Sequence, residues 1–369
     1  MTLNLFEMFA GYGGLSTAIE NVLGARTTAV AEIEPGPSRI LAHHYPHAPN
    51  LGDVTLAEWS DTGEVHVIGG GSPCQNISLA GKRRGMLHGT RSGLWASMRD
   101  AIAYHRPEFV VWENVRAATT AKASSAHDPN GTLGNLRALG RVLGDLAELG
   151  YNAEWTLARA SDVGACHQRA RIFLLAWDAM ARPVRDWADP SQQPFAWWNQ
   201  TADAFKMRGE IYRDKLPVSG ALHNGALYRR AHKSVAPPRA PKLLPTPTVG
   251  STSPAAHGQI SGDFRKRWDQ ALEAWGEYLP GIVHHAATLE MHDVPDPTMP
   301  GHREGSRRRL NPAFAEWMMG IPAGHVTNPA LGLTRQQQLT AIGNGVMTQQ
   351  AQWALTELYH RAAGVNGLH

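Results

Sequence analysis

Cys74 is the residue of this sequence best placed to do covalent chemistry. A short apolar run at 67–70 leads into a glycine turn and Pro73, directly before the cysteine. This pattern predicts a strand that ends in a turn, and ligands of open α/β sheets bind at the carboxyl ends of strands. A thiolate at that position could act as a nucleophile. Free cysteines are also commonly small buried hydrophobic residues, so this stretch by itself is compatible with either role.

A second stretch predicts a site for a nucleotide-type ligand. The glycine-rich turn at 10–14 separates an apolar run at 3–9 from a segment at 15–23 with helical spacing. Glycines let the backbone approach a ligand, and a helix N-terminus offers free N–H groups. Glu32 follows the turn by about 20 positions, where an acid can bind ribose hydroxyls. Because the glycines do not follow the G-x-G-x-x-G spacing, a nucleoside is favoured over a nicotinamide dinucleotide.

The elements that must position these residues alternate between strands and helices. This alternation predicts an α/β domain with a doubly wound, mostly parallel sheet. Predicted strands cover 3–9, 27–31, 67–70, 108–112, 151–158 and 172–176, and predicted helices cover 15–23, 37–45, 91–104, 132–149, 313–319 and 346–360.

The pattern changes near residue 178. From there to 306 the chain is rich in Pro, Trp, Arg and His and has weak periodicity. We expect a second, irregular domain or a long insertion there, with Trp187, Trp197 and Trp198 in its core. Strand and helix patterning returns after 307, which indicates that both ends of the chain build one domain.

Bulk composition narrows the class of protein. The chain has 369 residues, a formal net charge of +3 and two cysteines, which argues against a disulfide framework and for a reducing cytoplasm. It has no apolar run long enough for a membrane span, and its N-terminus enters a predicted strand without the basic region of a signal peptide. Basic clusters, among them 82–84 and 303–309, make a polyanionic partner plausible, and solvated surface is the alternative.

Motifs that carry chemistry occur in one order along the chain. They are Phe9-Ala10-Gly11-Tyr12-Gly13-Gly14, Gly71-Ser72-Pro73-Cys74-Gln75, Glu113-Asn114-Val115, the pair Arg169 and Arg171, and Gly343-Asn344-Gly345-Val346. Together they resemble the motifs of the DNA (cytosine-5)-methyltransferase family, of prokaryotic or phage type. The resemblance implies a Rossmann-like S-adenosylmethionine-dependent methyltransferase domain at 1–177 and 307–369, with a target-recognition domain at 178–306.

The resemblance also implies a reaction. C5 of cytosine is too weakly nucleophilic to take a methyl group from a sulfonium unaided. Addition of the Cys74 thiolate to C6 would activate C5. Glu113 would hydrogen-bond N3 as the acid, and Arg171 would stabilise charge at O2 with support from Arg169. The base that removes the C5 proton is not assigned, and water can serve.

The implied cofactor is S-adenosylmethionine, and no metal is expected. Glu32 would bind the ribose, Ile33 would pack on the adenine, and Asp53 would accept from the adenine amine. The full predicted pocket consists of Phe9, Gly11, Gly13, Glu32, Ile33, Asp53, Pro73, Asn344 and Val346. Contacts to the DNA and to the extruded base are predicted for Gln75, Ser78, Asn114 and Arg83.

A few positions depart from the family pattern. His167 stands where many members have Gln, Ala170 where they often have Glu, and Asn311 where Thr is common. Ile33 lacks the aromatic face that some members present to adenine. None of these is the nucleophile or the acid, so the departures concern fine contacts and leave the implied reaction unchanged.

Three functions remain open at this point. The first is a cytoplasmic, monomeric enzyme that methylates double-stranded DNA, in a bacterium or a phage-infected host, with or without a cognate restriction endonuclease. The second is a family member that acts on RNA. The third is an inactive nucleic-acid binder, against which the intact set of Cys74, Gln75, Glu113 and Arg171 argues.

Overall fold

The computed structural model describes residues 2–72, 94–120, 138–179, 218–223, 226–229, 242–247, 260–301 and 308–363. Five predicted site residues lie outside these ranges, namely Pro73, Cys74, Gln75, Ser78 and Arg83. The three tryptophans at 187, 197 and 198 also lie outside them.

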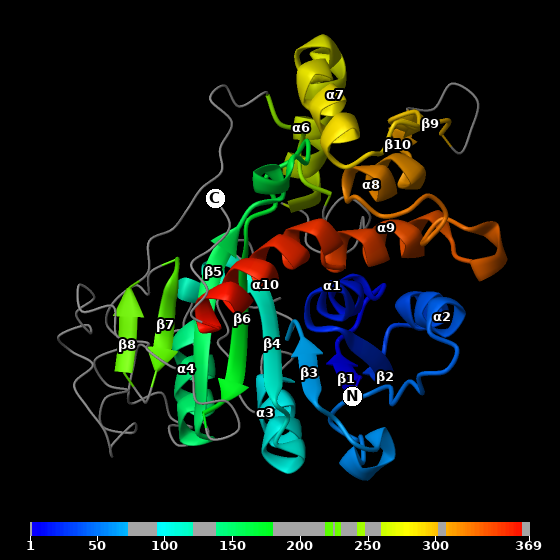
Figure 1. Cartoon of the computed structure of the whole chain (residues 1–369). Coiled ribbons are helices and arrows are strands. Elements are labelled where there is room, and N and C mark those ends of the chain that lie inside the picture. The colour runs from blue at the N-terminus through cyan, green and yellow to red at the C-terminus, as the bar shows by residue number, and fades with distance from the viewer. Residues whose placement is uncertain are drawn as a thin grey trace.

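One sheet organises the described residues, with strand order β2-β1-β3-β4-β6-β5-β7-β8 (Figure 1). β6 and β7 run opposite to the other strands, because each is antiparallel to its neighbours on both sides. The strands are β1 (Leu3–Met8), β2 (Ala25–Ala31), β3 (Val67–Gly70), β4 (Phe109–Val115), β5 (Tyr151–Ala158), β6 (Arg171–Asp178), β7 (Gly220–His223) and β8 (Ala226–Arg229).

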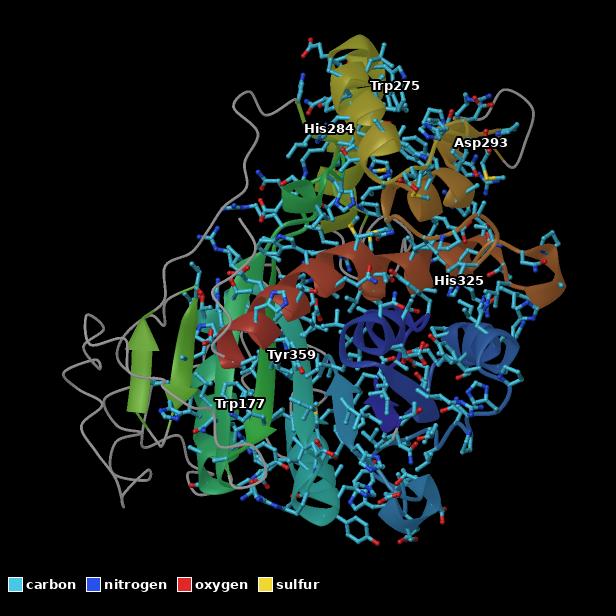
Figure 2. The ribbon with its side chains drawn as sticks, viewed as in Figure 1. Trp177, Trp275, His284, Asp293, His325 and Tyr359 are labelled. Carbon is cyan, nitrogen blue, oxygen red and sulfur yellow. The ribbon has the colours of Figure 1, made fainter. Side chains whose placement is uncertain are left out.

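Helices cover both faces of the sheet. α1 (Gly14–Leu23) and α10 (Thr348–Ala362) pack on one face, and α3 (Leu94–His105) and α4 (Ala138–Glu148) pack on the other. Successive β4 residues alternate between these layers, because side chains of a strand point to opposite faces. Val111 joins the α1 and α10 core, and Trp112 joins the α3 and α4 core. Tyr359 of α10 lies over the sheet in Figure 2, with its ring 6.3 Å from that of Phe109.

A separate helical layer lies beyond the sheet, at the top of Figure 1. It contains α6 (Ile260–Glu273), α7 (Leu279–Thr288), α8 (Pro312–Met318) and α9 (Arg335–Asn344). A short antiparallel pair, β9 (Thr298–Met299) with β10 (Arg309–Leu310), precedes α8. α2 (Pro35–His44) contacts α9. Trp268 of α6 and Ile282 of α7 share one buried cluster with Phe314 and Trp317 of α8.

His285 anchors α7 to the loop before β6 and to α8. Its Nδ1 accepts from the Cys166 backbone N–H at 3.2 Å, so Nε2 carries the ring proton and donates to the Trp317 carbonyl at 2.9 Å. Burial lowers the pKa of His285 to about 4, so the ring is neutral near pH 7. Cys166 is itself buried.

The predicted fold class is confirmed, and the predicted strands lie where the pattern placed them. The described residues of the interval 178–306 belong to two different parts of the structure. β7 and β8 extend the main sheet, whereas α6 and α7 pack on α8. The division into domains stays a prediction. Within the described ranges, no helix has the length and apolar character that crossing a membrane would need.

Glu7 joins β1 to the start of α1. Its side chain is 2% exposed, and Oε2 accepts from the Ser16 backbone N–H at 3.0 Å and from the Ser16 hydroxyl. Burial raises the pKa of Glu7 from 4.5 to about 8, with the Ser16 hydrogen bonds opposing the shift. The folded protein therefore keeps a proton that the unfolded chain releases between these two pH values.

This linkage predicts how Glu7→Gln changes stability. Glutamine retains an acceptor for Ser16 and does not ionise. We expect the free energy of unfolding of the wild type to fall relative to that of the variant as the pH rises from 5 to 8, by at most about 1.4 kcal/mol per pH unit, and the difference to level off above pH 8. Glu58→Gln, at an exposed position, controls for the loss of one charge. If stability changed with pH in the same way in the wild type and in Glu7→Gln between pH 5 and 8, this explanation would be ruled out.

Candidate active site

Glu113 and Arg171 form an ion pair at one edge of the sheet. The Arg171 Nε lies 2.9 Å from Glu113 Oε1, and the side chains are 18% and 12% exposed respectively. β4 and β6 are antiparallel, with Glu113 opposite Phe173. Arg171 lies two residues before Phe173, so the arginine and the acid are diagonal neighbours on one face of the sheet. The end of β4 and the beginning of β6 therefore bring together a predicted acid and a predicted cation.

Burial makes the Glu113 carboxyl a weaker acid than an exposed one. Burial raises the pKa of the Glu113 carboxyl, and the charges of Arg171 and Arg169 oppose that shift. A carboxyl of this kind can hold a proton at a higher pH than an exposed one and can donate a hydrogen bond. This chemistry matches the role predicted for Glu113.

Asn114 and Gly71 fix the backbone that leads into the Cys74 segment. The Asn114 amide donates to the Ser72 carbonyl at 3.1 Å, and the Trp112 indole donates to the Ser72 hydroxyl at 3.2 Å. A Cβ at Gly71 would lie 2.9 Å from Glu113 Oε2, so a side chain there would require the Glu113 carboxylate to shift. The chain is thus held beside the acid two residues before Cys74. Asn114 was predicted to contact substrate, and its described hydrogen bonds position the backbone.

Arg169 is buried at the loop before β6. Its exposed fraction is 3%, and its φ of +32° is in the left-handed region. Within the described ranges, the hydrogen bonds of its guanidinium lead to the backbone carbonyls of Pro247, Gly343 and Gly345. Its predicted support of Arg171 stays a prediction, and the observed contacts are those of a residue that positions other segments.

The glycine turn after β1 adopts the backbone conformation that its sequence predicts. Phe9, Gly11 and Gly13 have φ angles of +59°, +58° and +85°, and Gly13 is the N-cap of α1. The Phe9 backbone N–H donates to the Ala31 carbonyl at 2.8 Å, which places the turn beside the end of β2. Phe9 itself is half-buried against the core.

Glu32 lies next to this turn. Its Oε2 accepts from the Gly11 N–H at 2.8 Å, and its Oε1 accepts from the Glu34 N–H at 2.8 Å. Partial burial raises the pKa of Glu32, against the effect of these hydrogen bonds. Ile33 is 64% exposed, which is unusual for a large apolar side chain. A carboxylate beside a glycine turn and a bare apolar side chain fit the ribose and the base of an adenosine-type ligand.

Asp53 lies at the same edge on the segment that follows α2. Its Oδ1 accepts from both the backbone N–H and the hydroxyl of Thr55, at 2.9 and 2.8 Å, and these bonds lower its pKa. Asn50 ties this segment to Glu32, since its side chain accepts from the Glu32 N–H at 2.9 Å and donates to the Glu32 carbonyl at 3.1 Å. The two predicted acids are therefore connected through one asparagine.

Gly343-Asn344-Gly345-Val346, which we call the closing block, reaches the glycine turn from the other end of the chain. The Tyr12 hydroxyl donates to the Val346 carbonyl, and a Cβ at Gly345 would overlap the Tyr12 ring. Val346 is half-buried, whereas Asn344 at the end of α9 is exposed. His325, labelled in Figure 2, contacts the Tyr12 carbonyl through Nε2 at 2.9 Å. The turn is thus enclosed by residues more than 300 positions away in sequence.

The structure therefore brings two groups of predicted residues to one edge of the sheet. The carboxyl ends of β1, β2, β3 and β4 meet there because these strands are parallel. Sequence reasoning missed Asn50, Tyr12 and Ser72 as positioning residues. The pattern Asn50-Leu51-Gly52 could have indicated an Asx turn, since the Gly52 N–H donates to the Asn50 side chain at 3.0 Å. No local signal identifies Tyr12 or Ser72.

Comparisons with known proteins agree with this arrangement. The sheet shares its fold with methyltransferases of known structure. The solved structure of the S. pombe Dnmt2 methyltransferase shares this fold with a TM-score of 0.51 at 13% identity, over 97% of this chain and 98% of that one. The chain belongs to the C-5 cytosine-specific DNA methylase family, whose match covers residues 3–360.

Two curated relatives are named type II methyltransferases. M.CviJI of Paramecium bursaria Chlorella virus IL3A is 27% identical over 305 residues, which are 82% of this chain and 70% of the relative. M.NlaIV of Neisseria lactamica is 29% identical over 177 residues, 47% of this chain and 40% of the relative. The match thus spans less than half of M.NlaIV.

The geometry of Glu32 predicts a specific loss on mutation. Glu32→Ala removes the candidate ribose acceptor and the acceptor of the Gly11 N–H. We expect S-adenosylhomocysteine to bind about 10- to 100-fold more weakly by isothermal titration calorimetry, as for the loss of a hydrogen bond to a charged group. Glu34→Ala is the matched control, because that side chain is exposed. Equal losses in both variants would contradict the assignment.

Proposed function

We propose that this protein transfers a methyl group from S-adenosylmethionine to C5 of a cytosine in double-stranded DNA. The observation that carries the proposal is the Glu113–Arg171 pair, which lies beside Gly71 at the start of the Cys74 segment. The membership of the chain in the C-5 cytosine-specific DNA methylase family supports the same reaction.

The protein supplies a nucleophile and an acid to the base. The Cys74 thiolate adds to C6 and forms an S–C6 bond, and the electrons of the C5–C6 double bond make C5 nucleophilic. Glu113, protonated, hydrogen-bonds N3 and neutralises the charge that develops there. After C5 has received the methyl group, loss of the C5 proton to a base re-forms the double bond and expels the thiolate.

Arg171 has two tasks in this scheme. It holds the Glu113 carboxyl through the 2.9 Å contact of its Nε and donates from Nη1 to the Ala170 carbonyl at 3.1 Å, and its Nη2 would donate to O2 of the base. The two residues share one face of the sheet, so a base in contact with Glu113 is also within reach of Arg171. An extruded cytosine is required, because C6 is hidden within the duplex.

The cofactor site consists of Phe9, Gly11, Gly13, Glu32, Ile33, Asp53, Asn344 and Val346, together with Pro73. S-Adenosylmethionine, when bound, supplies the electrophilic methyl group. Glu32 and the glycine turn hold its ribose, exposed Ile33 packs on its adenine, and Asp53 accepts from the adenine amine. Gln75, Ser78 and Arg83 would contact the DNA from the segment that contains Cys74.

Residues 178–306 are proposed to read the DNA sequence. The names of the relatives as type II methyltransferases support a place in a restriction–modification system, in which a cognate endonuclease would be the partner. An RNA substrate and an inactive nucleic-acid binder are the alternatives.

A transfer assay separates these three functions. Purified protein is incubated with tritiated S-adenosylmethionine and either duplex DNA or transfer RNA. We expect label in DNA alone, and bisulfite sequencing of genomic DNA from expressing cells should then give the modified base and its context. Label in RNA alone would favour the second function, and no transfer with intact cofactor binding would favour the third.

Glu113→Gln tests the role of the acid. Glutamine cannot supply a carboxyl proton to N3, so we expect kcat to fall by about 10²- to 10⁴-fold. Binding of S-adenosylhomocysteine should change little, because Glu113 does not belong to the predicted cofactor pocket. Glu108→Gln, at the beginning of the same strand segment, is the matched control. A Glu113→Gln enzyme with a wild-type kcat would eliminate the carboxyl as the acid.

A further inference from the structure

Arg169 connects three segments that are distant in sequence. Its backbone N–H donates to the Thr246 hydroxyl at 3.2 Å, and its Nη1 donates to the Pro247 carbonyl at 3.3 Å. Its Nη2 donates to the Gly343 carbonyl at 3.1 Å and to the Gly345 carbonyl. The side chain therefore links the proposed recognition segment, residues 178–306, to the closing block.

The recognition side of Arg169 contains a cavity of about 360 Å³. Gln168 and Thr246, next to the arginine, line it together with Arg267, Gln270 and Tyr278 of the helical layer. Arg and Gln side chains are common readers of base edges and phosphates. Among the residues that the structure describes, no acidic side chain lines this cavity, which suits a segment of DNA as its occupant.

The opposite side of Arg169 leads to the cofactor site. Gly345, whose carbonyl accepts from the guanidinium, lies against the Tyr12 ring, and the Tyr12 hydroxyl donates to the next carbonyl, that of Val346. Tyr12 stands inside the glycine turn, and its neighbour Gly11 donates to Glu32. Continuous packing and hydrogen bonds thus run from Thr246 to the proposed ribose acceptor.

We infer that Arg169 is a positioning residue that couples DNA binding in the recognition segment to cofactor binding at the glycine turn. The inference rests on the proposed function. Contact of DNA with the cavity would fix the positions of Thr246 and Pro247. Because Arg169 bonds to both segments, it would then also fix the carbonyls of Gly343 and Gly345. Coupling between two binding sites is reciprocal, so the cofactor would strengthen DNA binding by the same factor.

An arginine suits this role better than a lysine. The planar guanidinium presents several N–H donors in fixed directions, and three of its acceptors are backbone carbonyls that belong to two segments. An ammonium group on a flexible chain cannot hold all three in this geometry. Arg169→Lys should therefore keep the charge and lose the link.

The test is a linkage cycle measured on the full-length protein. The Kd of S-adenosylhomocysteine is measured by calorimetry with and without a duplex that the wild type methylates, in the wild type, in Arg169→Lys and in Arg141→Lys. We expect the duplex to tighten wild-type binding by about 5- to 150-fold and Arg169→Lys binding by less than about one third of that factor. Arg141, buried on α4 and paired with Asp145, is the control and should retain the wild-type coupling.

Thr246→Val provides a second variant in case Arg169→Lys does not fold. It removes the hydroxyl that accepts from the Arg169 N–H, and we expect it to reduce the coupling while S-adenosylhomocysteine alone binds as in the wild type. The inference would be overturned if both variants kept the wild-type coupling factor or if the wild type showed no coupling. It would also be overturned if Arg141→Lys lost as much coupling as Arg169→Lys. Failure of the proposed function is distinguishable, because the wild type would then methylate no DNA.

Discussion

The site depends on one reversal of strand direction. β1 to β4 run parallel and deliver the glycine turn, Glu32 and Glu113 to the edge at their carboxyl ends. β6 runs the opposite way, so its first residue, Arg171, arrives at that same edge. A parallel β6 would carry Arg171 to the other end of the sheet. The antiparallel register also decides the face, because a slip by one residue would turn Arg171 away from Glu113.

The same edge is completed by residues from the opposite end of the chain. Gln350 of α10 is buried and donates to the carbonyls of Ala158 and Arg169, at 2.9 and 2.7 Å. The loop before β6 is therefore held from both sides, by α10 and by the closing block. Such a site is built by long-range contacts, and its geometry forms only once the whole domain has folded.

The sequence was most informative where function depends on local patterns. The strand, glycine turn and helix at 3–23, the acid Glu32 and the strand that ends in Glu113 could all be predicted, because each leaves a pattern within a few residues. Contacts between distant segments leave no such local pattern in the sequence. The links of Arg169 to 246–247 and 343–345, the Asn114 bond to Ser72 and the pairing of β7 with β5 depend on tertiary structure. The predicted roles of Pro73, Cys74, Gln75, Ser78 and Arg83 stay predictions.

The central claim is that Cys74 attacks C6 of a cytosine held by Glu113 and Arg171. Duplex DNA with 5-fluorocytosine in place of cytosine tests it most directly, because fluorine at C5 cannot leave as a proton and the adduct cannot resolve. The protein is incubated with this DNA and S-adenosylmethionine, digested and analysed by mass spectrometry. The account predicts a methylated fluorocytosine adduct on the Cys74 peptide and none in Cys74→Ala. An adduct at another residue, or one that survives in Cys74→Ala, would contradict it.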